Sequence, residues 1–362
     1  MTSLEAVAER AARSAFAYRF HRRHRSEAAR LLATIEADRG PLPGAVAQQC
    51  DDWAGDVLGW RGYAPWLRVY AAVAGRFREG WIPDNYYGRV VLPAVQGPYG
   101  EVSKLKPLSR RLLQSDLIAD VAYWVNGGLY GRDLQHLDRA DLAAALFDGA
   151  DRAVFKSDDS IQGAGVRVLH RSTFDPAALA TLPSGVFQSW VEQHPVLAAV
   201  TPDSVATVRV TTAVTDDGNA SVRAAYLRFG RAADTHVRSD SHVRVAVGTT
   251  DGRLAAEGFT PRWTTVAAHP DSGAGFAGLT VPGFAACTGA VLELHRRMPF
   301  ARCVGWDLTV DAGGHPVVLE WNAGHNDIKF SEATQGPCFA DMGWERLWRR
   351  GRTIPAQRGP GD

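Results

Sequence analysis

Two carboxylates in the segment 304–322 are placed where they can do chemistry together. Apolar and polar residues alternate along two runs of this segment, which is typical of half-buried strands, and Gly313-Gly314 between them favours a two-residue hairpin turn. Such a turn pairs 310 with 317, 308 with 319 and Asp307 with Glu320. The expected β-carbon separation of that last pair is about 4.5–5.5 Å. The predicted apolar face holds Trp306, Leu308, Val310, Val317, Leu319 and Trp321.

Like charges at that separation destabilise a sheet unless something compensates them. Asn322 lies two residues beyond Glu320 on the same predicted face, so Asp307, Glu320 and Asn322 together offer a set of hard oxygen ligands suited to Mg²⁺. Three other interpretations remain open at this point: a solvated polar face, a pair of carboxyls sharing one proton, and a carboxylate pair serving a hydrolase.

A second candidate is the segment Phe155–Val166, which has the pattern of a strand, a loop of small residues and a second strand. Lys156 at the strand end can reach phosphate oxygens, and Gly163 and Gly165 allow backbone N–H groups to approach a phosphate. The spacing matches neither a P-loop nor a Rossmann motif, and for this segment taken alone a plain turn is favoured over a phosphate loop. Lysine occurs at four positions, 104, 106, 156 and 329, among 40 basic residues, so each lysine is a candidate for a specific role.

Helices and then strands must position these residues. Residues 3–39 are predicted to be helical, with the basic cluster Arg19–Arg25 on a solvated face or facing an acidic partner. Gly and Pro at 40–44 end that helix, and 45–80 are expected to be helical again. The second helical stretch contributes the core aromatics Trp53, Trp60, Tyr63, Trp66 and Tyr70.

Short β-type runs dominate beyond Pro93. The expected strands are 121–124, 153–155, 165–170 and 185–191, with hairpins at 205–229, 243–256 and 304–322. Helices are expected at 104–113, 137–145, 174–182 and 284–298. This pattern predicts an α+β fold with an antiparallel sheet in the second half.

Composition limits the class of protein. The 362 residues carry a formal net charge of +1, which argues against a dedicated nucleic-acid binder. Four scattered cysteines favour a reducing, cytoplasmic location over a disulfide or zinc scaffold. The first 30 residues lack the apolar core of a secretory signal, and no apolar run is long enough for a membrane span.

Taken in order, residues 103–327 resemble the ATP-grasp superfamily, and in particular sugar-transfer-associated ATP-grasp proteins related to carboxylate–amine ligases. The motifs that carry the resemblance are Ser103-Lys104, Lys156 with Ser160-x-x-Gly163-x-Gly165, Gln188-Ser189-Trp190-Val191-Glu192-Gln193-His194-Pro195, Thr207-Val208-Arg209, Leu227-Arg228-Phe229-Gly230, His269-Pro270-Asp271, Gly305-Trp306-Asp307 and Leu319-Glu320-Trp321-Asn322. The family places Mg²⁺ on the same residues as the hairpin pattern does.

The resemblance implies two α+β lobes that clasp ATP, preceded by a helical region. The expected divisions are 1–92 (helical), 93–190 (N-terminal and lid lobe), 191–350 (C-terminal lobe with the metal hairpin) and 351–362 (tail). It assigns nucleotide binding to Lys104, Lys156, Ser160, Gly163, Gly165, Gln188, Ser189, Trp190, Val191, Glu192 and His194. It further implies that Arg209, Arg228 and Lys156 act on the γ-phosphate or on a substrate carboxylate.

The implied reaction is ATP- and Mg²⁺-dependent amide formation between a carboxylate and an amine through an acyl phosphate. A phosphotransferase on the same scaffold and a nucleotide-binding module without catalysis are the alternatives. Ala206 stands where the family usually has Asn, and residues 234–242 differ from its usual pattern, which points to a different acceptor. The substrate candidates are His236, His269, Asp327 and Lys329. The substrates are small molecules, free or carrier-linked, and the helical region leaves a homodimer open.

Overall fold

The structure is a computed structural model that describes residues 3–158, 165–231 and 241–349. The described chain divides into two compact units. The first contains the residues up to Pro98, Arg262–Thr264 and the residues from Asp327 onward, and the second contains Tyr99–Pro261 and Thr265–Asn326. Among the described helices, none offers the long apolar stretch that crossing a membrane requires.

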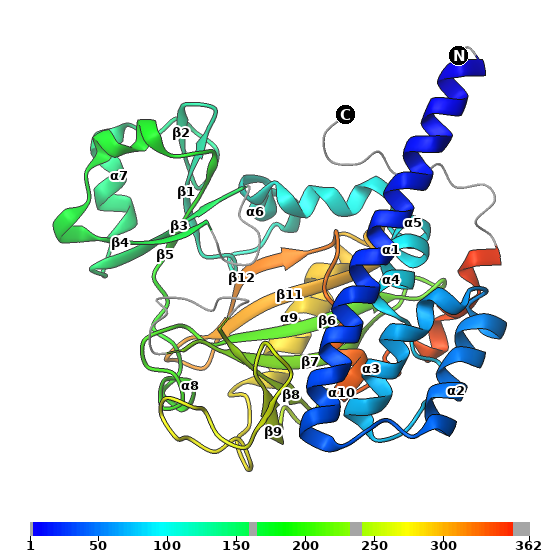
Figure 1. Ribbon diagram of the computed structural model, residues 1–362. Coiled ribbons are helices and arrows are strands. Elements are labelled where there is room, and N and C mark those ends of the chain that lie inside the picture. Colours follow the sequence, from blue (N-terminus) through cyan, green and yellow to red (C-terminus); the bar gives the residue numbers. More distant parts are fainter. Residues whose placement is uncertain (1–2, 159–164, 232–240, 350–362) are drawn as a thin grey trace. The chain divides into compact units, whose positions relative to one another are not determined.

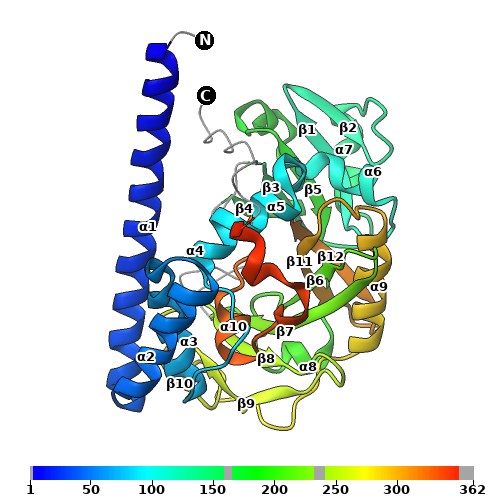
Figure 2. The ribbon, with the colours of Figure 1, turned by 90° about the vertical axis from the view of Figure 1, so that its right-hand side faces the viewer.

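The first unit is helical. Its longer helices are α1 (Ser3–Arg39), α2 (Gly44–Asp52) and α3 (Ala64–Ala74), and its shorter ones are α4 (Asp84–Tyr86), α5 (Leu92–Val95) and α10 (Lys329–Thr334). Helix α3 packs against both α1 and α10, and α1 runs alongside α3 in both views (Figures 1 and 2). The predicted helix 3–39 is therefore confirmed, and it ends at Gly40, whose φ is +90°.

The second predicted helical stretch is wrong in part, because 45–80 is not continuous. A π-helical turn (Trp53–Val57), Gly59 with φ of +81° and a 3₁₀ turn (Arg61–Tyr63) separate α2 from α3. Helix α3 then ends at Gly75 in the left-handed conformation that favours glycine. The expected aromatic core is confirmed for Trp66 and Tyr70, which are fully buried, but Trp60 is 45% exposed.

The second unit contains two antiparallel sheets (Figure 1). The smaller sheet has the order β2-β1-β5-β3-β4. Its strands are β1 (Asp120–Val125), β2 (Gly128–Gly131), β3 (Arg152–Ser157), β4 (Val166–His170) and β5 (Gly185–Ser189). Helix α7 (Arg139–Leu146) packs on this sheet and confirms the helix predicted at 137–145. The predicted helix at 174–182 is instead a 3₁₀ segment, Pro176–Thr181. Two short segments precede the sheet, a 3₁₀ turn at Lys106–Leu108 and α6 (Ser109–Leu113).

The larger sheet has seven strands among the described residues, in the order β10-β9-β8-β7-β6-β11-β12. They are β6 (Thr207–Val214), β7 (Ala220–Phe229), β8 (Val243–Val247), β9 (Leu254–Phe259), β10 (Thr265–Val266), β11 (Cys303–Val310) and β12 (Pro316–Asn322). Helix α9 (Phe284–Arg296) covers one face of β6, β7 and β11 and shares their apolar core (Figure 2). Because side chains alternate along a strand, the opposite face is left for Arg209 and Asp307.

The carboxylate hairpin confirms one half of the predicted register and corrects the other. Asp307 lies opposite Glu320, as expected. Nearer the turn, however, Leu308 lies opposite Val318, so the register there is shifted by one residue. The turn spans three residues, with the Asp311 N–H donating to His315 O at 2.9 Å and only Gly314 at positive φ (+87°) in the loop.

A β-bulge at Leu319 reconciles the two registers, because this residue has no partner on β11. Val318, rather than Val317 or Leu319, therefore joins Trp321 in the core. On the polar face, Thr309 is fully buried and Asp307 is 7% exposed, whereas Glu320 and Asn322 are half-buried.

Candidate functional site

Asp307 is held between two arginines from neighbouring strands. Within the described residues its carboxylate accepts from Arg209 Nε at 2.5 Å, from Arg209 Nη2 at 2.9 Å and from Arg228 Nη2 at 2.5 Å. The sheet produces this arrangement because Arg209 lies opposite Asp307 and Arg228 lies opposite Thr207, one diagonal step away. Burial alone would raise the pKa of Asp307, but the two guanidinium groups outweigh it and hold that pKa well below its usual range.

Glu320, unlike Asp307, has no arginine partner among the described residues. It is half-buried, and no hydrogen bond or ion pair of its carboxylate is found within the described residues. Asn322 follows two residues later on the same face, opposite Gly305. In the part of the chain that the structure describes, no three acidic, histidine or cysteine side chains gather closely enough to bind a metal by themselves. The predicted Mg²⁺ set of Asp307, Glu320 and Asn322 therefore stays a prediction.

Lys156 joins the smaller sheet to the hairpin. Its Nζ donates to the carbonyl oxygen of Leu319, the bulge residue, at 3.0 Å. Burial lowers the pKa of Lys156, and the negative charges of Glu320, Asp120 and Asp307 oppose that shift. The predicted phosphate lysine and the predicted metal carboxylates thus lie close enough to act on one another electrostatically.

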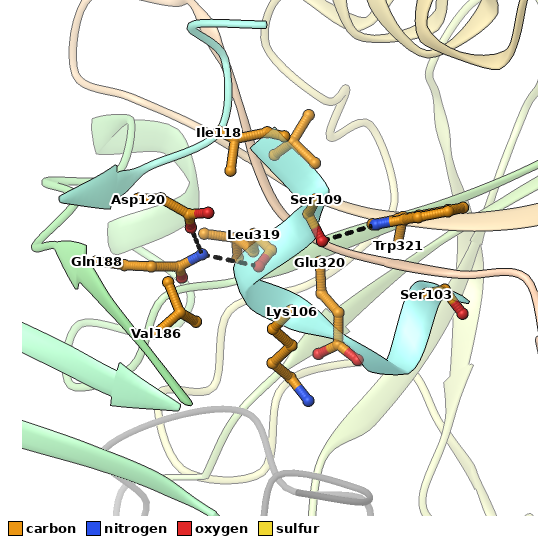
Figure 3. A pocket seen from close by; sticks show the side chains of 11 residues that line it. Ser103, Lys106, Ser109, Ile118, Asp120, Val186, Gln188, Leu319, Glu320 and Trp321 are labelled. Carbon is orange, nitrogen blue, oxygen red and sulfur yellow. Dashed lines mark hydrogen bonds between the residues drawn. The ribbon is translucent and has the colours of Figure 1, made fainter. Parts of the chain in front are cut away.

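A pocket lies beside this cluster (Figure 3). It is lined by Ser103, Lys106, Ser109, Ile118, Asp120, Val186, Gln188, Val318, Leu319, Glu320 and Trp321. Only Gln188 and Glu320 of these were predicted site residues, so the other two charged residues, Lys106 and Asp120, were missed. Lys106 is 8% exposed and donates to Asp158 O at 3.2 Å, whereas the predicted Lys104 pairs with Glu101 and its side chain is 60% exposed. The scarcity of lysine was the available sequence signal, but it did not separate residue 104 from residue 106.

The predicted nucleotide-binding segment that begins at Gln188 meets the pocket through one residue. Gln188 lines it, whereas Ser189 is exposed and donates to Ala119 O. Beyond them, the Arg152 guanidinium lies 3.9 Å from the centre of the Trp190 ring and 3.2 Å from the exposed Glu192 carboxylate. The roles predicted for Ser189, Trp190, Val191 and Glu192 stay predictions.

His194 caps a short helix. Its Nδ1 accepts the N–H of Val196 at 3.2 Å and caps the short helix α8 (Pro195–Ala198). The glycine loop is described only at its end, where Gly165 O accepts the Ser157 N–H at 3.2 Å. Ser160, Gly163 and His236 lie outside the described residues.

The substrate candidates are placed differently from one another. His269 is 2% exposed, and its Nε2 lies 2.9 Å from the Gly230 carbonyl oxygen, so it anchors the chain after Arg228. Lys329 belongs to the first unit, where its Nζ lies 3.2 Å from Glu27, 3.6 Å from Asp327 and 3.9 Å from Asp84.

Burial would lower the pKa of Lys329, but the three carboxylates around it outweigh that effect and raise the pKa. Asp327 has a φ of +48°, a left-handed conformation that is uncommon for residues other than glycine. The substrate roles of His269, Asp327 and Lys329 stay predictions.

A sequence model of the family described as sugar-transfer-associated ATP-grasp matches residues 178–340, and this match supports the predicted resemblance to the ATP-grasp superfamily. The predicted α+β fold with a helical N-terminal region is confirmed, and the described strands form two sheets. No curated protein matches the chain significantly.

Three of the solved structures that match the chain are similar to it at low identity. The ATP-grasp ligase PsnB, complexed with a minimal precursor, is 17% identical, with a TM-score of 0.41 over 83% of this chain and 75% of that one. The D-cycloserine synthetase DcsG is 18% identical, with a TM-score of 0.40 over 70% and 73%. The biotin carboxylase of Campylobacter jejuni is 9% identical, with a TM-score of 0.40 over 70% and 46%. The chain spans less than half the length of the first solved structures that it matches.

Proposed function

We propose that the protein is an ATP- and Mg²⁺-dependent ligase that joins a carboxylate to an amine. The observation that carries the proposal is the arrangement on one face of the larger sheet, where Asp307 and Glu320 face each other and Arg209 and Arg228 hold Asp307. Lys156 reaches the same hairpin from the smaller sheet. Alternating acidic and basic groups of this kind suit a phosphoryl-transfer site, where positioning and charge stabilisation supply most of the catalysis.

The donor chemistry fits a magnesium ion. The Glu320 carboxylate lines the pocket without an internal partner among the described residues. An ionised carboxylate offers about four acceptor positions, and described N–H groups reach Asp307 in three contacts, which leaves room for one more. Asp307, Glu320 and Asn322 would hold the ion, and bound Mg²⁺ would neutralise charge on the β- and γ-phosphates.

The chain's own cations would handle the remaining charge. Lys156 would exchange the Leu319 carbonyl for a phosphate oxygen, and Lys106 would approach the same phosphates from the pocket wall. Arg209 is fixed by Asp307 on one side and by the Asn326 carbonyl on the other, at 2.9 Å from Nη1. A guanidinium held in this way can orient a substrate carboxylate without moving.

In the first step, a carboxylate oxygen of the substrate would attack the γ-phosphorus and break its bond to the β-phosphate bridging oxygen. The products are an acyl phosphate and ADP. In the second step, the amine nitrogen would attack the acyl carbon, the C–O bond to phosphate would break, and the nitrogen would lose a proton. The amide and inorganic phosphate result.

A trapping assay tests this function. Protein, ATP, Mg²⁺ and hydroxylamine are incubated with a panel of carboxylic acids, and hydroxamate and ADP are measured together. Equal amounts of the two support the ligase, and Glu320→Ala should abolish both. ADP accompanied by a phosphorylated acceptor would indicate a phosphotransferase instead. Absence of Mg²⁺-ATP binding, measured as the shift in thermal unfolding that a bound ligand causes, would refute the nucleotide site itself.

A further inference from the structure

Gln188 presents its side-chain amide to the pocket from β5. The residue is 4% exposed and lies opposite Asp120 on β1 and opposite Val154 on β3. Figure 3 shows its side chain between Asp120 and Leu319, with Val186 from the same strand nearby. The orientation of this amide decides whether the pocket meets a hydrogen-bond donor or an acceptor.

Both neighbours of the Gln188 nitrogen are acceptors. Its Nε2 lies 2.8 Å from Asp120 Oδ1 and 3.4 Å from the carbonyl oxygen of Leu319 (Figure 3). A backbone carbonyl has no hydrogen to donate, and an ionised carboxylate has none either. The reversed amide would place Oε1 against two oxygens and lose both hydrogen bonds. The neighbours therefore fix the amide with its nitrogen toward them.

Asp120 is itself firmly placed. It is 3% exposed, and its second oxygen, Oδ2, accepts the Tyr123 hydroxyl at 3.2 Å. With Tyr123 on one oxygen and Gln188 on the other, the carboxylate has one orientation. Within the described residues, no partner is found for Gln188 Oε1.

We propose that Asp120 is a specificity-determining residue: it holds the Gln188 carbonyl oxygen available to the pocket and so selects a purine with a 6-amino group over one with a 6-oxo group. The inference rests on the proposed nucleotide site. A 6-amino group donates a hydrogen bond to Oε1, whereas a 6-oxo group brings a second acceptor to it. One such mismatch corresponds to about a ten- to hundredfold difference in affinity.

Inosine triphosphate is the sharpest probe, because it differs from ATP in the 6-oxo group and the proton that this group places on N1. Dissociation constants of both nucleotides are measured with Mg²⁺ by calorimetry. We expect the wild type to prefer ATP at least tenfold. Equal affinities would overturn the role of Asp120 and leave the proposed function standing, whereas binding of neither nucleotide would overturn both.

The variant Asp120→Asn separates the specificity role from a structural one. Its amide can donate or accept, so Gln188 is free to turn over, and we expect the ATP preference to fall to within about threefold. The matched control is Asp133→Asn, an exposed site in the same sheet region, which should keep the wild-type ratio. If Asp120→Asn weakens both nucleotides equally and keeps their ratio, the inference is wrong.

A second variant keeps the test decisive if Asp120→Asn does not fold, as judged by circular dichroism. Gln188→Met has a similar length and lacks the amide, so the ratio of the two affinities should approach one. A wild-type ratio in this variant would show that Gln188 does not discriminate, which would also overturn the inference.

Discussion

The contact between Asp307 and its two arginines makes a prediction about stability. Replacement of Asp307 by asparagine keeps the side-chain shape but removes the negative charge from a site that is 7% exposed. Arg209 and Arg228 would then face each other across a neutral amide in a buried position. Removing one partner of a buried ion pair typically costs about 3–5 kcal/mol, because the remaining charge is left uncompensated.

We therefore expect Asp307→Asn to lower the free energy of unfolding of the second unit by about 3 kcal/mol. The measurement is urea unfolding followed by circular dichroism at pH 7. Asp203→Asn is the control, since it makes the same chemical change at an exposed position of the same unit and should stay close to wild type. A loss of less than about 1 kcal/mol in Asp307→Asn would refute the reasoning.

The pH dependence provides a second check on the same residue. Arg209 and Arg228 depress the pKa of Asp307 in the folded state, so its stabilising contribution is present above the ordinary aspartate pKa of 3.8. The contribution is lost as the pH falls below that value. Wild type should accordingly lose stability on acidification below about pH 4 more steeply than Asp307→Asn. Parallel acid profiles would contradict the prediction.

Three further outcomes are expected. Burial raises the pKa of Glu332 from 4.5 to about 7, so its contribution to the free energy of unfolding falls by up to about 3 kcal/mol as the pH rises through that window. Denaturant unfolding at several pH values should show this pH dependence in the wild type and not in Glu332→Gln. The same pH dependence in both proteins would contradict the prediction. Lys106→Met should weaken ATP binding in calorimetry by tenfold or more and Lys104→Met by less than threefold, since Lys106 lines the pocket; equal effects would reverse that assignment. Lys329→Met removes the ammonium group that lies among Glu27, Asp84 and Asp327, and it should lower the thermal unfolding midpoint at pH 7. A midpoint equal to that of wild type would show that these ion pairs do not contribute to stability.

Much of the fold could be predicted from residue pattern alone. Alternation along the strands and the Asp and Gly turns determine the hairpins locally, so β6 with β7 and β8 with β9 were expected in place. The helix at 45–80 was overpredicted, because apolar spacing continues through a segment in which Gly59 and the turns on either side of it interrupt the helical backbone. Local periodicity does not report such interruptions.

The acidic pair of the site could be predicted from the sequence, but its contacts with basic residues could not. The pairing of Asp307 with Glu320 follows from counting along a hairpin, whereas the pairing of Asp307 with Arg209 depends on which strand is the neighbour of β11. Strand order is a property of the whole sheet and is not encoded in the spacing of either strand. The same limit applies to Asp120, which reaches the pocket because β1 lies beside β5.

The bulge at Leu319 has a consequence for how the hairpin tolerates change. The half nearest the turn and the half that carries Glu320 follow different registers, and the unpaired residue between them absorbs the difference. The carbonyl oxygen of Leu319 accepts hydrogen bonds from both Lys156 and Gln188, because this residue has no partner on β11. Loop grafting at residues 312–314 should therefore leave the carboxylate pair in register, which makes this turn a suitable attachment point for a reporter group.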